Sequence, residues 1–261
     1  MTPFNPMPSQ IRTIAAYTLL ESLRNRLLWL VLLAAVAAIG LSGFLNELAL
    51  TEKTEMQLAI MAAFLRMAAV FLIASFVISS MLREAHDKGV ELLLALALPR
   101  SAYVLGKLAG YIMLATLIAI LFGLLTAFLA PVQQSALWTL SLMFECWIVV
   151  AFAVLCVISL AQMVPSLCAV AGFYLLARSI SILQIIGDQN VGEATASQQI
   201  ISTMVHGLAT VLPHFDAFTR SDWLLYGLGS WHQLALLAGQ SVIYLGLLTA
   251  ATLFDLYRKN I

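Results

Sequence analysis

The chain has 261 residues, of which 62% are hydrophobic and only 10% are charged, and its formal net charge at pH 7 is zero. Soluble domains usually carry about 25% charged residues, so this chain has too little polar surface to form a water-soluble globule. The balanced charge gives no reason to expect nucleic acid as a partner. We therefore predict an all-α integral membrane protein.

The first predicted element is an amphipathic helix over residues 9–26, which Ser9 can cap. Polar and apolar side chains recur at helical spacing on two faces: Gln10, Thr13, Tyr17, Glu21 and Arg24 on one, and Ile11, Ile14, Ala15 and Leu19 on the other. A helix with this division is expected to lie in the membrane interface. The alternative is that these residues extend the first transmembrane helix.

Six apolar stretches are long enough to cross the bilayer, which takes about 20 residues. They are Leu27–Leu45, Gln57–Leu82, Ala109–Ala130, Leu137–Ala161, Ser166–Ile186 and Gln233–Phe254. Neither an internal repeat nor a low-complexity linker divides the sequence. We therefore predict a single transmembrane domain, residues 1–261, with six spans.

The distribution of basic residues predicts the orientation of the spans. If the N-terminus is cytoplasmic, nine basic residues fall on that side: Arg12, Arg24, Arg26, Arg83, Lys88, Arg100, Lys107, Arg258 and Lys259. Only Lys53 and Arg220 fall on the other side. This bias places both termini in the cytoplasm of a bacterial cell and the chain in its inner membrane.

The connection between the second and third spans, residues 83–102, combines charge with a short apolar helix. Its distinctive residues are Arg83, Glu84, Asp87, Lys88, Gly89, Glu91, Leu94, Pro99 and Arg100. Lys88 and Glu91 are three residues apart and can pair on one helix face. Leu92 to Leu98 is too short to span a membrane, so the segment suits docking of a cytosolic partner. A re-entrant hairpin, or an interfacial helix without a partner, is equally compatible with the pattern.

Three ionisable residues fall within predicted spans: Arg66, Glu145 and Arg178. Counted from the outer helix ends at 1.5 Å per residue, all three lie roughly 12–14 Å below the outer surface. We expect Glu145 to pair with one or both arginines, since charges inside membranes mostly pair with one another. The cluster is then either a polar clamp between spans two, four and five or a polar lining that binds an anionic group.

The longest outer connection, residues 187–232, predicts one short helix and an aromatic segment. Thr195 and Gln198 fit a capping box before an apolar run that ends at Pro213, so the helix should rest on the outer face of the bundle. The aromatic side chains suit the headgroup level, as anchors or as the lining of a substrate exit: Phe215, Phe218, Trp223, Tyr226 and Trp231.

The sequence contains none of the catalytic motifs expected of a soluble enzyme. It has no phosphate-binding loop, no H-E-x-x-H, no paired cysteines and no G-x-S-x-G, and its four histidines are scattered through loops. A membrane enzyme that modifies lipids would need clustered carboxylates or histidines. The acidic group of Glu84, Asp87 and Glu91 is neutralised by Arg83 and Lys88. We predict a non-catalytic chain without a metal site.

The run from Glu91 (ELLLA) through Pro99 and Arg100 to Gly106 and Lys107 resembles the E-L-L-L-A-x-P-x-S-R-x-x-x-x-x-G-K signature of ABC-2 type permeases. The similarity is closest to the branch that includes the permease of nitrous oxide reductase maturation. It extends to the basic entry helix and the count of six spans. The sequence departs from the signature before Pro99 and at Arg100, which follows the proline directly.

This resemblance implies the membrane subunit of an ABC transporter, most simply an exporter. Two copies would pair, and each would be gripped by a cytosolic ABC ATPase at residues 83–102, the coupling helix, while residues 9–26 form the connecting helix. ATP and magnesium would bind to the ATPase, so this chain needs no cofactor. Further expected partners are membrane lipid and an extracytoplasmic accessory protein. The alternative is a subunit that transmits mechanical work in an assembly complex without bulk transport.

Overall fold

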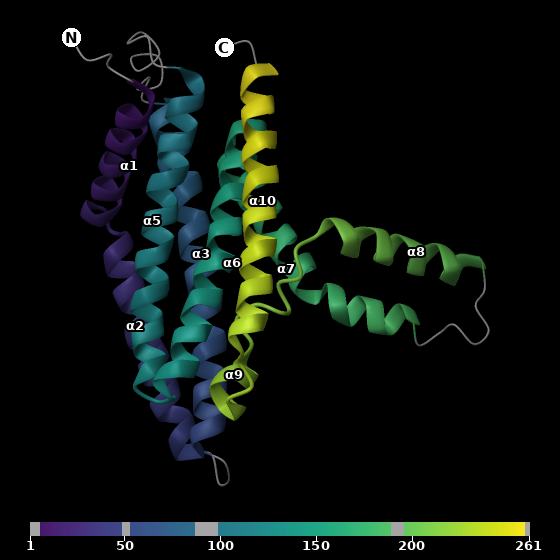
Figure 1. Cartoon of the computed structure of the whole chain (residues 1–261). Coiled ribbons are helices and arrows are strands. Elements are labelled where there is room, and N and C mark those ends of the chain that lie inside the picture. Colours follow the sequence, from purple (N-terminus) through teal and green to yellow (C-terminus); the bar gives the residue numbers. More distant parts are fainter. Residues whose placement is uncertain (1–5, 49–52, 87–98, 189–195, 259–261) are drawn as a thin grey trace.

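The computed structural model describes residues 6–48, 53–86, 99–188 and 196–258, and it is helical almost throughout this part. The helices are α1 (Pro6–Arg24), α2 (Leu27–Leu48), α3 (Lys53–His86), α5 (Arg100–Ala127), α6 (Val132–Leu160), α7 (Met163–Asp188), α8 (Ala196–Val211), α9 (Ser221–Tyr226) and α10 (Trp231–Arg258). The start of α1 and the end of α10 lie at the same end of the bundle, which we call the terminal end (Figure 1).

Six of these helices, α2, α3, α5, α6, α7 and α10, are long and apolar enough to cross a membrane. This confirms the all-α fold and the six predicted spans. Two helices run well past their predicted ends: α3 continues to His86 and α5 begins at Arg100. The predicted connection 83–102 is therefore shorter than expected, because its first and last residues belong to these helices. Ion pairs between helices stabilise the added turns, and hydropathy does not detect such pairs.

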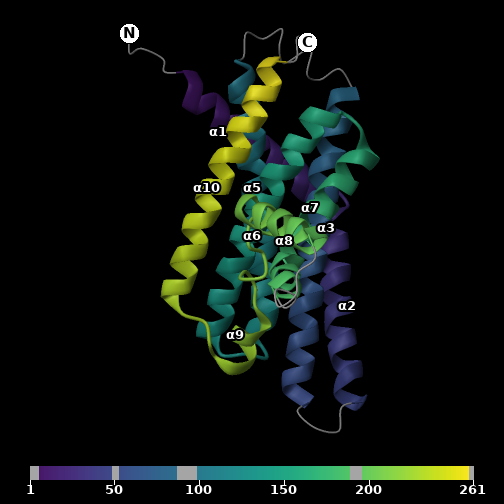
Figure 2. The ribbon, with the colours of Figure 1, turned by 90° about the vertical axis from the view of Figure 1, so that its right-hand side faces the viewer.

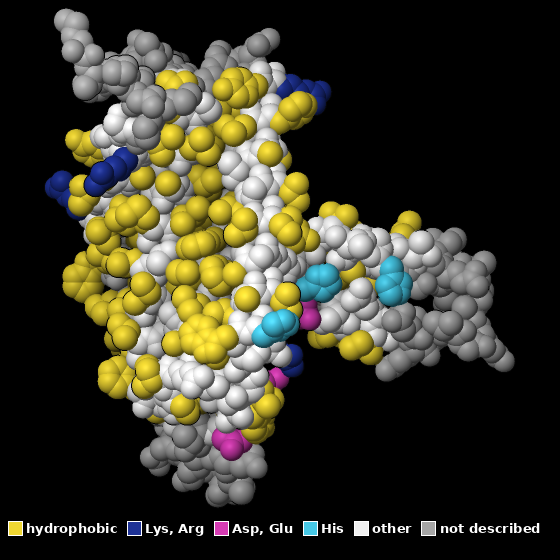
Figure 3. Space-filling model, viewed as in Figure 1, with side chains coloured by type: hydrophobic (Ala, Val, Ile, Leu, Met, Phe, Trp, Pro, Cys, Tyr) yellow, Lys and Arg dark blue, Asp and Glu magenta, His cyan; other side chains and the backbone are white. Residues whose placement is uncertain are grey.

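Helix α6 occupies the centre of the bundle. The buried share of its membrane-spanning residues is 67%, compared with 28% for α2 and 17% for α10. It packs against α3, α5, α7 and α10, whereas α2 packs mainly against α3 at the edge (Figures 1 and 2). Apolar side chains cover much of the side of the bundle (Figure 3), as a lipid-facing surface requires.

Helix α1 is a separate helix, which rules out the alternative that it extends the first span. It begins at Pro6 rather than at Ser9, and a break at Asn25 and Arg26 separates it from α2. There the Asn25 side-chain oxygen accepts a hydrogen bond from the backbone N–H of Arg26 (2.7 Å). The sequence led us to expect this helix in the membrane interface. Its apolar face instead packs along α5, so that face is covered by protein.

Helix α8 corrects the prediction of a helix resting on the outer face of the bundle. It packs against α7, and together they form a hairpin that projects sideways from the bundle (Figure 1). The helix ends at Val211, two residues before Pro213. Thr195, the predicted capping residue, lies outside the described residues.

The segment that follows α8 also differs from its prediction. Phe215 and Phe218 are fully buried and Trp223 is nearly so, whereas Tyr226 and Trp231 are exposed. The ring of Phe215 packs edge-on against Phe218 (5.8 Å between ring centroids). The first three aromatic residues therefore belong to the core and are not anchors at the headgroup level. The cause is a set of hydrogen bonds: two partly buried arginines, Arg66 and Arg178, bind backbone carbonyls of this segment, as described below.

Candidate functional site

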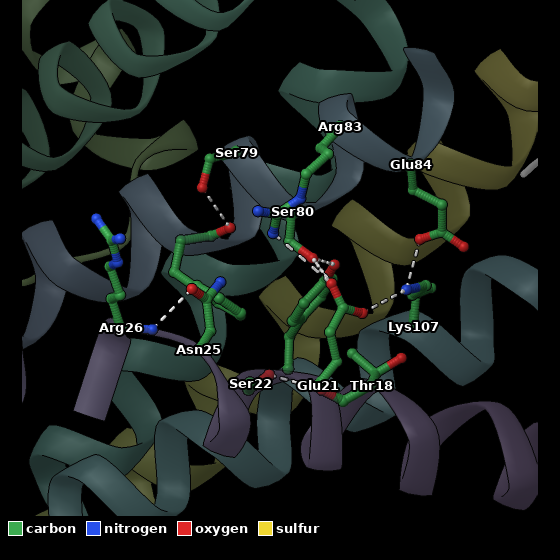
Figure 4. Close-up of polar contacts among 12 residues, drawn as sticks. Thr18, Glu21, Ser22, Asn25, Arg26, Ser79, Ser80, Arg83, Glu84 and Lys107 are labelled. Carbon is green, nitrogen blue, oxygen red and sulfur yellow. Dashed lines mark hydrogen bonds and ion pairs between the residues drawn. The ribbon is translucent and has the colours of Figure 1, made fainter. Parts of the chain in front are cut away.

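Four charged side chains from three helices meet near the terminal end, and we call this group the charged junction: Glu21 of α1, Arg83 and Glu84 of α3, and Lys107 of α5 (Figure 4). The Lys107 Nζ atom lies 2.6 Å from Oε2 of Glu84 and 3.7 Å from Oε2 of Glu21. The Arg83 guanidinium lies 3.8 Å from Oε1 of Glu21. Glu21 and Lys107 thus link all three helices.

Lys107 is the buried member of the junction. The residue is only 5% exposed, while the side chains of Glu21 and Glu84 keep 44% and 22% exposure. A buried ammonium group is stable only when paired, so Lys107 depends on both carboxylates. Its Nζ atom also lies 6.0 Å from the centroid of the Tyr111 ring, at the limit of a cation–π contact. These partners fix the position of Lys107 between α1 and α3.

A chain of hydroxyl groups continues the junction into the bundle. The Tyr111 hydroxyl donates to Oγ of Ser80 (3.2 Å), and the Ser80 hydroxyl donates to Oε1 of Glu21 (3.2 Å). The same three helices are therefore joined by hydrogen bonds as well as by ion pairs.

Glycines on α5 allow α1 to approach closely enough for these contacts. A Cβ atom on Gly106 would lie 2.7 Å from Cβ of Ile14, and one on Gly110 would lie 2.6 Å from Cβ of Thr18. Both distances are too short for real atoms, so any larger residue would push α1 away. Gly106 and Gly110 form a small-x-x-x-small pair, the usual means of close helix packing in membranes. They lie on the same helix as Lys107 and set its distance from α1.

A second charged cluster lies inside the bundle and contains the three predicted residues. Glu145 of α6 is fully buried, and its Oε1 atom lies 3.9 Å from the Arg178 guanidinium of α7. Its carboxylate also accepts hydrogen bonds from the Tyr174 hydroxyl (2.8 Å) and the Thr219 hydroxyl (2.5 Å). The Arg66 side chain of α3 joins the group through Thr219, whose carbonyl it binds (3.1 Å).

The two arginines mainly bind the backbone of the segment after α8. Arg178 donates to the carbonyl oxygens of Phe215 and of Phe218, the latter at 2.9 Å. Thr219 adopts a left-handed conformation (φ 44°), which is uncommon for a β-branched residue, and its N–H donates to Oγ of Ser141. Residues 215–219 are therefore held inside the bundle by side chains of three spanning helices.

Comparison with known proteins identifies the family. A family model described as ABC-2 type transporter matches residues 9–180, about two thirds of the chain. This chain belongs to the ABC-2 type transporter family. The match begins in α1 and ends in α7, so it includes the whole charged junction and all three intramembrane charges. A comparison with curated protein sequences finds no match.

Family membership makes this chain a multi-pass membrane subunit of an ABC transporter. Such ABC-2 permeases are generally non-catalytic and typically work with a cytosolic ATPase subunit. Among the residues that the structure describes, no three His, Cys, Asp or Glu side chains are grouped closely enough to hold a metal ion.

The structure places the predicted coupling residues of this ABC-2 permease in two groups. Arg83 and Glu84 lie in the last turn of α3, while Pro99 precedes α5 and Arg100 begins it. The others lie outside the described residues: Asp87, Lys88, Gly89, Glu91 and Leu94. Arg83 and Glu84 face α1 and α5, where they belong to the charged junction.

Sequence reasoning did not assign a site role to two members of the junction, Glu21 and Lys107. A signal for Lys107 was present, since it is the only charged residue between Ser101 and Ala127. A lone charge in an apolar helix needs a partner in the bundle. The identity of that partner could not be read from the sequence, because Glu21 and Glu84 belong to other helices.

Proposed function

We propose that this ABC-2 permease is the membrane subunit of a bacterial exporter. In this proposal a separate cytosolic ATPase binds ATP and magnesium, and its hydrolysis cycle drives a substrate across the inner membrane. The terminal end of the bundle, with both chain termini, faces the cytoplasm. The ATPase contacts residues 83–102, the connection between α3 and α5.

The charged junction is the observation that supports this mechanism best. Residues 87–98 connect α3 to α5, and Lys107 and Glu84 join these two helices close to the ends that this connection links. Glu21 adds α1 to the same unit. A displacement of the connection by the ATPase would therefore move α1, α3 and α5 together and not be absorbed by one flexible helix end.

The α7–α8 hairpin supports a pair of permease copies. Only 28% of the spanning residues of α7 are buried within one chain. Large apolar side chains stay exposed on the hairpin: Leu175, Ile182, Ile185, Met204 and Leu208. Because the hairpin projects from the bundle (Figure 1), a second copy is the partner that would cover it in a homodimer.

We interpret the intramembrane cluster as a polar clamp and not as a substrate lining. Arg66 and Arg178 both donate to backbone carbonyls of residues 215–219, and Arg178 also pairs with Glu145. Groups engaged in this way are poorly placed to bind an anionic substrate. Substitution of Glu145 with Gln should therefore impair assembly; intact assembly with altered ATPase stimulation would support the lining instead.

The proposal is tested by isolating the complex and separating binding from coupling. The permease is crosslinked in native membranes, solubilised and analysed for an attached ATPase, and the complex is then reconstituted in nanodiscs. Glu91→Arg should abolish ATPase attachment. Lys107→Met should retain attachment of the ATPase but lose stimulation of ATP hydrolysis. Lys107 lies outside the proposed ATPase contact at residues 83–102, but it joins the helices that would transmit the movement. Asp222→Asn on α9, which breaks an exposed ion pair with the preceding Arg220, is the matched control.

Absence of any crosslinked ATPase, or full stimulation in Lys107→Met, would overturn the coupling mechanism. The direction of transport is measured by ATP-dependent uptake of labelled lipids, peptides and small molecules into inside-out vesicles. ATP hydrolysis without uptake of any of these three kinds of substrate would favour the alternative, in which the subunit transmits mechanical work in an assembly complex.

A further inference from the structure

A groove with a volume of about 600 Å³ lies beside the charged junction, between α1 and α3. Its lining residues are Tyr17, Leu20, Glu21, Arg24, Asn25 and Arg83. Figure 4 shows Glu21, Asn25 and Arg83 together on this side of the junction. The groove is open on one side, so a ligand could enter it from the surroundings of α1.

The groove carries unbalanced positive charge. The Arg83 guanidinium forms a long ion pair, 3.8 Å, with the Glu21 carboxylate. The same carboxylate also pairs with Lys107. Arg24 is exposed, and within the described residues it forms no ion pair. Two guanidinium groups thus face one groove with a single, shared carboxylate. A planar guanidinium can bind a phosphate through two parallel hydrogen bonds, so the charge pattern favours a phosphate group.

The position of the groove relative to the membrane indicates which molecule supplies that phosphate. Arg24 is the last residue of α1, and the apolar span of α2 begins at Leu27. Leu27 is only three positions after Arg24, so even a fully extended chain keeps Arg24 within about 11 Å of the start of this span. Lipid phosphates lie at this level, and Arg side chains near a span end reach toward it.

The apolar side chains around the groove also fit a lipid better than a soluble anion. Tyr17 and Leu20 line it and are 70% and 54% exposed. In the first turn of α2, Trp29 is 73% exposed. A water-filled phosphate site would leave these surfaces in contact with water. Acyl chains would cover them, with the phosphate above.

We propose that this groove binds an anionic phospholipid, whose phosphate contacts Arg24 and Arg83 and whose acyl chains lie against Leu20 and the outer face of α2. The site requires only that α2 spans the membrane, and it is independent of coupling to an ATPase. Because Arg83 also pairs with Glu21, the bound headgroup is adjacent to the charged junction.

The test uses the full-length chain, delipidated in detergent and titrated with phosphatidylglycerol and phosphatidylcholine, with bound lipid counted by native mass spectrometry. Wild type should prefer phosphatidylglycerol. Each arginine removed should reduce this preference about fivefold, since a basic residue contributes about 1 kcal/mol near an anionic lipid surface. Arg24→Gln breaks no ion pair within the described residues, so it reports on the groove even if Arg24→Gln/Arg83→Gln fails to fold. Arg12→Gln changes an exposed arginine of the same helix outside the groove and is the control.

Three results would overturn the proposal. One is an unchanged preference in Arg24→Gln, and another is an equal loss in Arg12→Gln. The third is complete displacement of the lipid by millimolar inorganic phosphate, which would identify a site for free anions. Retained binding in Arg24→Lys, together with loss in Arg24→Gln, would support it.

Discussion

Removal of the Lys107 charge should destabilise the whole bundle, because this side chain joins three helices. Lys107→Met keeps most of the apolar stem and deletes the ammonium group. Breaking a fully buried ion pair costs about 3–5 kcal/mol. Here the carboxylate side chains of Glu21 and Glu84 remain 44% and 22% exposed, so water compensates part of the loss. We therefore expect the free energy of unfolding to fall by about 2 kcal/mol.

The assay is equilibrium unfolding in mixed micelles of dodecyl maltoside and sodium dodecyl sulfate. A double-mutant cycle with Glu84→Gln should give a coupling energy of about 1–2 kcal/mol, because these two groups lie 2.6 Å apart. The double variant should recover part of the stability, since no unpaired buried charge remains. A loss in Lys107→Met no larger than that of the exposed control Asp222→Asn would refute the argument that the junction stabilises the bundle.

Three further predictions concern packing, the buried cluster and topology. Gly110→Leu should lower the free energy of unfolding by about 1–3 kcal/mol in the same assay, because a side chain there overlaps α1, whereas Gly172→Leu, which has open space around it, should not. Arg178→Met should lower it by about 2–4 kcal/mol, since the buried Glu145 loses its ion pair and two carbonyls lose their donor; a near-neutral result would contradict the clamp. In intact cells, a membrane-impermeant maleimide should label Asp222→Cys but not Arg258→Cys, and the reverse pattern would invert the proposed orientation.

The sequence was sufficient to predict features whose free energy of membrane insertion or folding depends on a local run of residues. Leu27–Phe44 contains no charged residue and is strongly hydrophobic, so its transfer into lipid is favourable whatever its neighbours are. The separate α1 helix was predicted from its two faces, although the structure shows that α5 and not lipid covers the apolar one. Arg66, Glu145 and Arg178 were recognised because each is costly in an apolar span.

Contacts between distant segments were decided only by the tertiary structure. The partners of Lys107 lie on α1 and α3, and no local pattern shows that Gly106 and Gly110 let α1 approach them. The aromatic prediction for Phe215 and Phe218 was wrong for the same reason. Hydropathy places such rings at the membrane surface, but Arg178 binds their backbone carbonyls and holds them in the core. The sequence alone determined which segments enter the membrane, because that depends on their own composition; how they pair depends on packing between segments, which only the folded bundle defines.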